Sequence, residues 1–179
     1  MTAAVISVCA DSELAELAAL VNAAYRGEGG ESGWTSEIGL VDGKRVTLDS
    51  LRHDLATSPD MTIYQLRERQ DLLACVRLED GRGTRDRPAC YISMLAVRPA
   101  RQDGGLGRRM LDFAEAQGCN RGARLARMTV VSIRLGLIAW YERRGYRRSG
   151  ETLPFPYDDG RFGKPQRDDL EFVVLQKEL

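Results

Sequence analysis

The sequence predicts a single α/β domain, residues 1–179, with a mixed and mostly antiparallel sheet of about seven strands and about four flanking helices. Two features predict it. An apolar run at residues 91–97 is followed by a glycine-rich turn, an amphipathic stretch and another apolar run at 127–133, an order typical of a strand, a crossover helix and a parallel strand. Apolar or alternating runs on either side of this unit indicate further strands joined by short turns.

The N-terminal part of the chain predicts a short strand at residues 6–9 and a helix with an apolar stripe at 14–25. Several glycines then form a loop that ends in Trp34 and Glu37. Loops that carry such residues often contact ligands, so we expect Trp34 and Glu37 to bind substrate. The alternative is that Trp34 plugs the edge of the core and Glu37 caps a helix.

A second helix is predicted at residues 46–56, and it contains the single histidine, His53. A pKa near 6.5 would suit a catalytic base, but the charged neighbours Arg52 and Asp54 favour an exposed surface position. With one histidine and no paired cysteine spacing, a metal centre or a Ser-His-Asp triad has little material, so we expect no metal. Four scattered cysteines favour buried free thiols in a reducing cytoplasm: Cys9, Cys75, Cys90 and Cys119.

The middle of the chain predicts three antiparallel strands. Residues 61–67 and 72–78 are joined by a short polar turn and should form a hairpin. The charged segment 79–88 is the expected loop of a second hairpin into the strand at 91–97. Pro99 ends that strand, because proline has no N–H to donate to a neighbouring strand.

A glycine-rich turn at residues 102–107 leads into an amphipathic helix that Gly118 is expected to end. The first turn of a helix has unpaired N–H groups and partial positive charge, and glycines let an anion approach the backbone. The turn therefore predicts a phosphate site. It lacks the Gly-Lys-Ser/Thr of a nucleoside-triphosphate loop and the third glycine of a dinucleotide fingerprint.

The spacing of Gln102, Gly105 and Gly107 resembles the pyrophosphate loop of the GNAT superfamily of amine N-acetyltransferases, Arg/Gln-x-x-Gly-x-Gly/Ala. A second stretch is similar to the closing motif of that family, aromatic-Tyr-Glu-x-x-Gly-Phe/Tyr. It matches at five positions: Trp140, Tyr141, Glu142, Gly145 and Tyr146. The resemblance is specific from residue 91 to 146 and topological elsewhere in the chain.

The resemblance implies acetyl-coenzyme A as co-substrate and a bulge that splays the two central strands apart, so that the pantetheine arm pairs with exposed strand amides. It also implies that the loop amides bind the diphosphate. Many relatives carry Asn where Arg134 stands, and Arg134 is a candidate for the coenzyme phosphates. The expected coenzyme-binding residues are Leu95, Ala96, Val97, Gln102, Asp103, Gly104, Gly105, Leu106, Gly107, Arg108 and Arg134.

By the same resemblance, Tyr141 lies near the coenzyme sulfur and protonates the departing thiolate as a general acid. Thiol and tyrosine pKa values near 8.5 and 10 make this transfer chemically reasonable. The alternative is a packed helix aromatic whose hydroxyl is satisfied within the protein. The base that deprotonates the amine stays open between Glu37, Glu79 and a chain of water molecules.

The proline- and aromatic-rich segment 152–167 is expected to be an ordered loop over the acceptor side of the cleft. Tyr157 is a candidate for substrate binding, and Asp158 and Asp159 could meet a cationic amine or be solvated turn residues. Residues 170–176 predict the last strand. Equal counts of basic and acidic residues, 26 each, argue against nucleic-acid binding, and no apolar run is long enough for a membrane span.

The function that the resemblance implies is transfer of an acetyl group from acetyl-coenzyme A to a primary amine of a small molecule or peptide, in the cytoplasm. A homodimer is left open. Two alternatives from other classes remain at this point. One is a non-catalytic acyl-coenzyme A sensor with the same fold, and the other is a nucleotide-binding module.

Overall fold

A computed structural model describes residues 4–30, 33–81 and 83–179. Seven strands form one mixed sheet in the order β1-β3-β4-β5-β6-β9-β7, and within it only β5 and β6 pair in parallel. These strands are β1 (Val5–Val8), β3 (Met61–Glu68), β4 (Asp71–Glu79), β5 (Ala89–Val97), β6 (Leu125–Val131), β7 (Arg147–Pro154) and β9 (Glu171–Glu178). The predicted fold class is therefore confirmed. Two short strands, β2 (Val41–Asp42) and β8 (Lys164–Pro165), pair separately.

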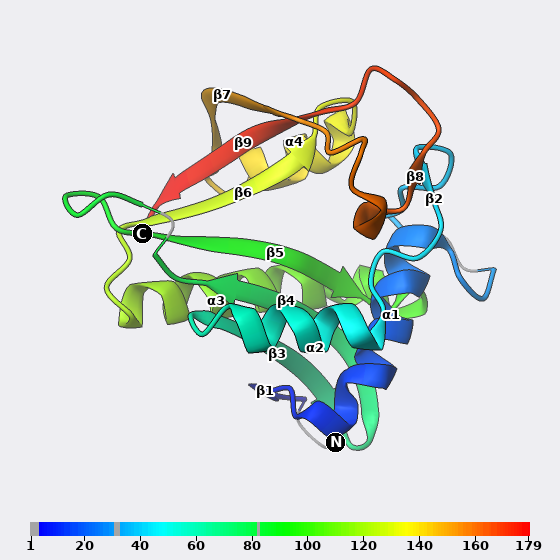
Figure 1. Cartoon of the computed structure of the whole chain (residues 1–179). Coiled ribbons are helices and arrows are strands. Elements are labelled where there is room, and N and C mark those ends of the chain that lie inside the picture. Colours follow the sequence, from blue (N-terminus) through cyan, green and yellow to red (C-terminus); the bar gives the residue numbers. More distant parts are fainter. Residues whose placement is uncertain (1–3, 31–32, 82) are drawn as a thin grey trace.

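The described ranges contain four α-helices and three short 3₁₀ turns. They are α1 (Leu14–Arg26), α2 (Leu48–Thr57), α3 (Leu106–Asn120), α4 (Leu135–Glu142), η1 (Asp11–Glu13), η2 (Pro99–Gly104) and η3 (Gly160–Phe162). Figure 1 shows α1 and α2 on one face of the β1-to-β5 half of the sheet and α3 on the other face. Within these ranges no helix is long and apolar enough to cross a bilayer.

The core has two main clusters, one on each face of the β3-to-β5 region. On the α3 face, Met110 and Leu111 are fully buried against the sheet, and the cluster continues to Tyr141 on α4. On the other face, Leu17 of α1 and Leu51 of α2 are fully buried. The strands can serve both clusters because successive side chains point to opposite faces.

The two central strands part after a short parallel ladder. This ladder runs from the pair Ala89–Leu125 to the pair Tyr91–Arg127, although both strands continue beyond it. On its other side, β5 has a bulge against β4, and Met94 lies at the bulge with a positive φ of 52°. The expected splay between the central strands is thus present, and Figure 1 shows β5 and β6 diverging.

Several sequence-based boundaries differ from the structure. Helix α3 runs past Gly118, which is buried so close to β5 that a Cβ there would lie 2.4 Å from the Cys90 sulfur. The chain turns instead at Gly122, where φ is +88°. Helix α2 begins at Leu48, because the Thr47 hydroxyl accepts a hydrogen bond from the amide of Ser50 and caps it.

Two other expectations are corrected in part. The segment 152–167 is not wholly a loop, since β7 extends to Pro154 and β8 lies near its end. The cysteines are free, as predicted, but Cys119 is exposed while the other three are buried. His53 is exposed on α2, in agreement with the surface interpretation.

Candidate active site

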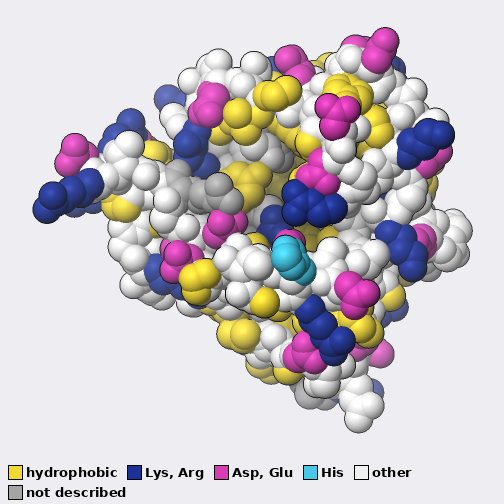
Figure 2. Space-filling model, viewed as in Figure 1, with side chains coloured by type: hydrophobic (Ala, Val, Ile, Leu, Met, Phe, Trp, Pro, Cys, Tyr) yellow, Lys and Arg dark blue, Asp and Glu magenta, His cyan; other side chains and the backbone are white. Residues whose placement is uncertain are grey.

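A cavity of about 450 Å³ lies where β5 and β6 part. Figure 2 shows a hollow between the two halves of the sheet, with cationic side chains in it and at its edge. Aromatic side chains from distant parts of the chain line the cavity together with the facing residues of both strands. They are Tyr25, Tyr91, Tyr141, Phe155, Phe162 and Phe172. The hydroxyls of Tyr91 and Thr129 lie 2.6 Å apart and bridge β5 to β6 just beyond the end of their ladder.

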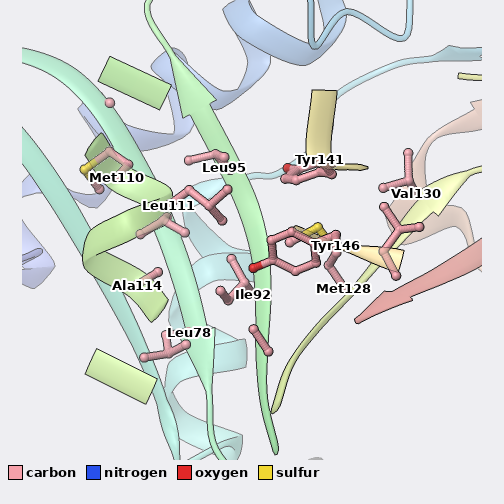
Figure 3. Close-up of a cluster of buried hydrophobic side chains, with 14 of the residues drawn as sticks. Leu78, Ile92, Leu95, Met110, Leu111, Ala114, Met128, Val130, Tyr141 and Tyr146 are labelled. Carbon is pink, nitrogen blue, oxygen red and sulfur yellow. The ribbon is translucent and has the colours of Figure 1, made fainter. Parts of the chain in front are cut away.

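Tyr141 lies on α4, an apolar helix followed by Gly145, whose φ of +91° few other residues tolerate. Its side chain is 7% exposed and makes edge contacts with the rings of Trp140 and Tyr146. Figure 3 shows Tyr141 between the side chains of β5 and those of β6. Burial, and secondly the nearby Tyr25, raise the pKa of Tyr141 far above its ordinary value, so its hydroxyl stays protonated.

The last residues of β5 meet protein donors that sequence reasoning did not foresee. The Tyr25 hydroxyl donates to the carbonyl of Leu95 at 3.1 Å, and the Gln102 amide nitrogen donates to the carbonyl of Val97 at 3.1 Å. Ala96 and Val97 still pair with β4. The carbonyls of Leu95 and Val97 therefore have hydrogen-bond partners within the protein itself.

The turn before α3 has the features that a diphosphate site needs. Gly105 is the N-cap residue of α3, with a φ of 71° and no side chain that could accept hydrogen bonds from the first amides. No acidic residue lies in the first turn. Asp103, Gly104 and Arg108 are exposed beside it, and Arg108 is 3.6 Å from Asp112 in a surface ion pair. Uncapped amides at a helix N-terminus attract anions, so the residues present fit the diphosphate of coenzyme A.

Trp34 connects the segment that follows β5 with the segment that follows β6. Its amide donates to the Gln102 side chain at 2.9 Å, and its carbonyl accepts from Arg134 at 2.8 Å. Its ring stacks on Trp140 with centroids 4.8 Å apart. A Cβ on Gly107 would lie 3.3 Å from the Trp34 ring, so the missing side chain of Gly107 makes room for tryptophan in this structure.

The cavity has a positive lining. Among its described residues, Glu37 is the one carboxylate, against four arginines: Arg26, Arg45, Arg77 and Arg134. Glu37 lies 3.3 Å from Arg26, and both side chains are largely buried, at 12% and 5% exposure. Burial lowers the pKa of Arg26, and Glu37 opposes that shift. Burial also raises the pKa of Tyr25 to about 12, against the opposing effect of Arg45.

The predicted acceptor residues divide between the cavity and its surroundings. Glu37 and Arg134 line the cavity, whereas Trp34 and Tyr157 are not among its lining residues. The Tyr157 hydroxyl instead accepts from the Leu170 amide at 2.6 Å. Asp159 caps η3 and pairs with Arg161 at 2.6 Å. In the described part of the chain, no group of three or more potential metal ligands is found, and His53 does not line the cavity.

Several polar residues of the cavity were not predicted from the sequence, among them Tyr25 and the arginines Arg26, Arg45 and Arg77. In the sequence, Tyr25 belongs to the apolar stripe of the first predicted helix, and the arginines stand in no recognisable motif.

The central strand pair parts beside a glycine turn before α3 and the buried Tyr141, as the resemblance to GNAT acetyltransferases implied. The model of the acetyltransferase (GNAT) family matches residues 34–146. This is more than half of the chain, which therefore belongs to the GNAT acetyltransferase family. A search of curated protein sequences finds no significant match.

Solved structures share the fold along almost the whole chain. Ribosomal-protein-alanine N-acetyltransferase from Brucella melitensis has a TM-score of 0.71 at 16% identity, over 98% of this chain and 99% of that one. An acetyltransferase from Salmonella typhimurium, solved with its cofactor acetyl-CoA, has a TM-score of 0.69 at 17% identity, over 99% and 94%. The NatC complex, solved with Gag peptide and CoA, contains a chain with a TM-score of 0.68 at 14% identity, over 98% and 98%.

Proposed function

We propose that this protein transfers the acetyl group of acetyl-coenzyme A directly to a primary amine of a small molecule or peptide. The observation that carries the proposal is the position of Tyr141, a buried tyrosine that lines the cavity where β5 and β6 part. Family membership supports acetyl transfer, and structural neighbours solved with CoA or acetyl-CoA support the co-substrate.

The residues proposed to hold the coenzyme lie along one path. Amides from Gln102 to Arg108, at the uncapped start of α3, would bind the diphosphate, and Arg134 adds positive charge across the gap. Within Leu95, Ala96 and Val97, the amides that do not bond to β4 are the proposed contacts for the pantetheine arm and the thioester carbonyl. When bound, acetyl-coenzyme A supplies an acetyl group activated as a thioester.

The chain then supplies three effects. Strand amides near Leu95 stabilise negative charge on the carbonyl oxygen, as in an oxyanion hole. Tyr141 holds a proton at its phenol oxygen for the sulfur that leaves. The excess of arginines disfavours the ammonium form of an amine in the cavity, and attack requires the neutral amine.

Glu37 is the proposed general base, acting directly or through water. Of the carboxylates considered from the sequence, Glu37 lines the cavity, whereas Glu79 is outside it at the end of β4. The ion pair with Arg26 fixes the Glu37 carboxylate in place. Family membership and a neighbour solved with a peptide support an amine acceptor, and the proposal includes both peptides and small amines.

Two measurements together test this function. Acetyl-coenzyme A and ATP are compared in a thermal-shift assay, because a ligand of the native state raises the melting temperature. Release of free thiol is then followed with a panel of amines and amino-terminal peptides. The proposal predicts stabilisation by acetyl-coenzyme A and amine-dependent thiol release. Stabilisation without turnover on any amine would indicate a sensor, and stabilisation by ATP alone would indicate a nucleotide-binding module.

A further inference from the structure

The arginines of the cavity differ in how their charge is balanced. Arg26 is paired with Glu37 and donates to the carbonyls of Val41 and Phe162 at 2.7 and 2.8 Å. Arg77 is paired with Asp54 at 3.1 Å. These two arginines are therefore largely neutralised and held by the protein itself.

Arg45 and Arg134 lack such compensation. The Arg134 guanidinium donates to the carbonyl of Trp34, and Arg45 has neither an ion pair nor a side-chain hydrogen bond to any described residue. Neither guanidinium pairs with a carboxylate in the part of the chain that the structure describes. A partly buried guanidinium with no anionic partner is costly unless a ligand supplies one.

Arg45 is nevertheless held in place. The buried side chain of Asn22 accepts hydrogen bonds from the amides of Arg45 and Val46, at 2.7 and 3.2 Å, and this fixes the backbone. The guanidinium carbon lies 5.7 Å from the ring centroids of both Tyr25 and Phe162, within the range of cation–π attraction. A buried asparagine and two aromatic rings thus hold the Arg45 guanidinium in place at the cavity.

We propose that the acceptor carries an anionic group, a carboxylate or a phosphonate, a few bonds from its amine, and that Arg45 binds this group. The inference rests on the proposed acetyl transfer and narrows its substrate class. A bare ammonium would meet uncompensated positive charge, whereas a planar guanidinium fork matches the oxygens of such an anion. Tyr25 lies between the proposed anion site at Arg45 and the proposed thioester site at Leu95, because its ring contacts Arg45 and its hydroxyl donates to the Leu95 carbonyl.

The test compares matched acceptors that differ at one group. Phenylalanine, its aminophosphonate analogue and phenethylamine share the same amine and ring, and tryptophan with tryptamine gives a second pair. For each, kcat/KM for acetylation is measured with saturating acetyl-coenzyme A. We expect the anionic members to be preferred by about tenfold or more, and the preferred anion to identify carboxylate or phosphonate.

Arg45→Gln should remove that preference by raising KM for the anionic acceptors about tenfold or more, and it should leave phenethylamine unchanged or improved. Arg45→Lys, which keeps the charge and loses the fork, should retain part of it and guards against a folding defect in the first variant. Arg147→Gln, the same change at an exposed position on β7, is the matched control and should change nothing. Affinity for acetyl-coenzyme A should be equal in all four proteins.

Several results would overturn the inference. If phenethylamine is acetylated as well as phenylalanine by the wild type, the anionic group is irrelevant while acetyl transfer stands. If Arg45→Gln weakens acetyl-coenzyme A binding instead, Arg45 belongs to the coenzyme site. If no amine is acetylated, the proposed function fails. Calorimetric titration of the same compounds into the coenzyme A complex then decides the inference alone, since Arg45-dependent binding of the anionic members supports it and equal binding refutes it.

Discussion

Replacing Tyr141 by phenylalanine removes one oxygen atom from the proposed proton donor. The ring is 7% exposed and contacts Trp140 and Tyr146 at centroid distances of 5.0 and 5.6 Å, and phenylalanine keeps both contacts. Within the described ranges no hydrogen bond involves the Tyr141 hydroxyl, so its removal leaves no protein group unpaired. The free energy of unfolding should therefore change by about 1 kcal/mol or less.

The expected effect on catalysis is much larger. Loss of a positioned general acid typically lowers kcat by about a hundredfold to ten-thousandfold, or about 3 to 5 kcal/mol in the activation barrier. The assay is thiol release at saturating acetyl-coenzyme A and amine, with the affinity for acetyl-coenzyme A measured separately and expected to be retained. Because burial raises the pKa of Tyr141, the wild-type enzyme should show no loss of kcat from its ionisation up to about pH 10.

Tyr146→Phe is the matched control. The Tyr146 ring is also buried, but its hydroxyl donates to Glu115 at 3.0 Å and does not line the cavity. This variant should lose about 1 kcal/mol of stability and keep its turnover. Tyr141 is not the general acid if Tyr141→Phe keeps kcat within about threefold of the wild type from pH 6 to 10, since a general acid contributes at least about a hundredfold.

Two further predictions concern the fold. Gly118→Ala should destabilise the protein by about 1–3 kcal/mol in urea unfolding, because its Cβ would lie 2.4 Å from the Cys90 sulfur. The control is Gly136→Ala on α4, where a Cβ would meet no atom within 4 Å, and it should be neutral or stabilising by up to about 1 kcal/mol. Equal effects of the two substitutions on stability would contradict the packing described. At pH 8 a thiol reagent should modify the exposed Cys119 fast and the buried cysteines slowly. For Cys90, burial raises the pKa to about 11 and so suppresses the reactive thiolate. Rapid modification of two or more thiols would contradict this prediction.

Most of the fold could be predicted because its signals are local. Alternating and apolar runs place the strands, and the glycine turn with Pro99 before it places the start of α3. The position of Gly118 could not be predicted, since a glycine that ends a helix and one that packs against a strand have the same local sequence. Only the tertiary contact with Cys90 distinguishes them.

The candidate site was only half predictable for the same reason. Tyr141 and the glycine turn belong to motifs with fixed spacing, so the sequence alone identifies them. Arg45 is positioned at the cavity by a hydrogen bond from its backbone amide to Asn22, 23 positions earlier in the chain. Its guanidinium is held by contacts with the rings of Tyr25 and Phe162. Such long-range placement leaves no periodic pattern in the sequence, and so the positive charge of the cavity lining could not be predicted.

The most direct measurement is a crystal structure of the protein with coenzyme A. We expect the diphosphate to lie on the amides at residues 102–108 and the sulfur to lie within hydrogen-bond reach of the Tyr141 hydroxyl. A coenzyme bound outside the gap between β5 and β6, or a sulfur that Tyr141 cannot reach, would contradict this expectation.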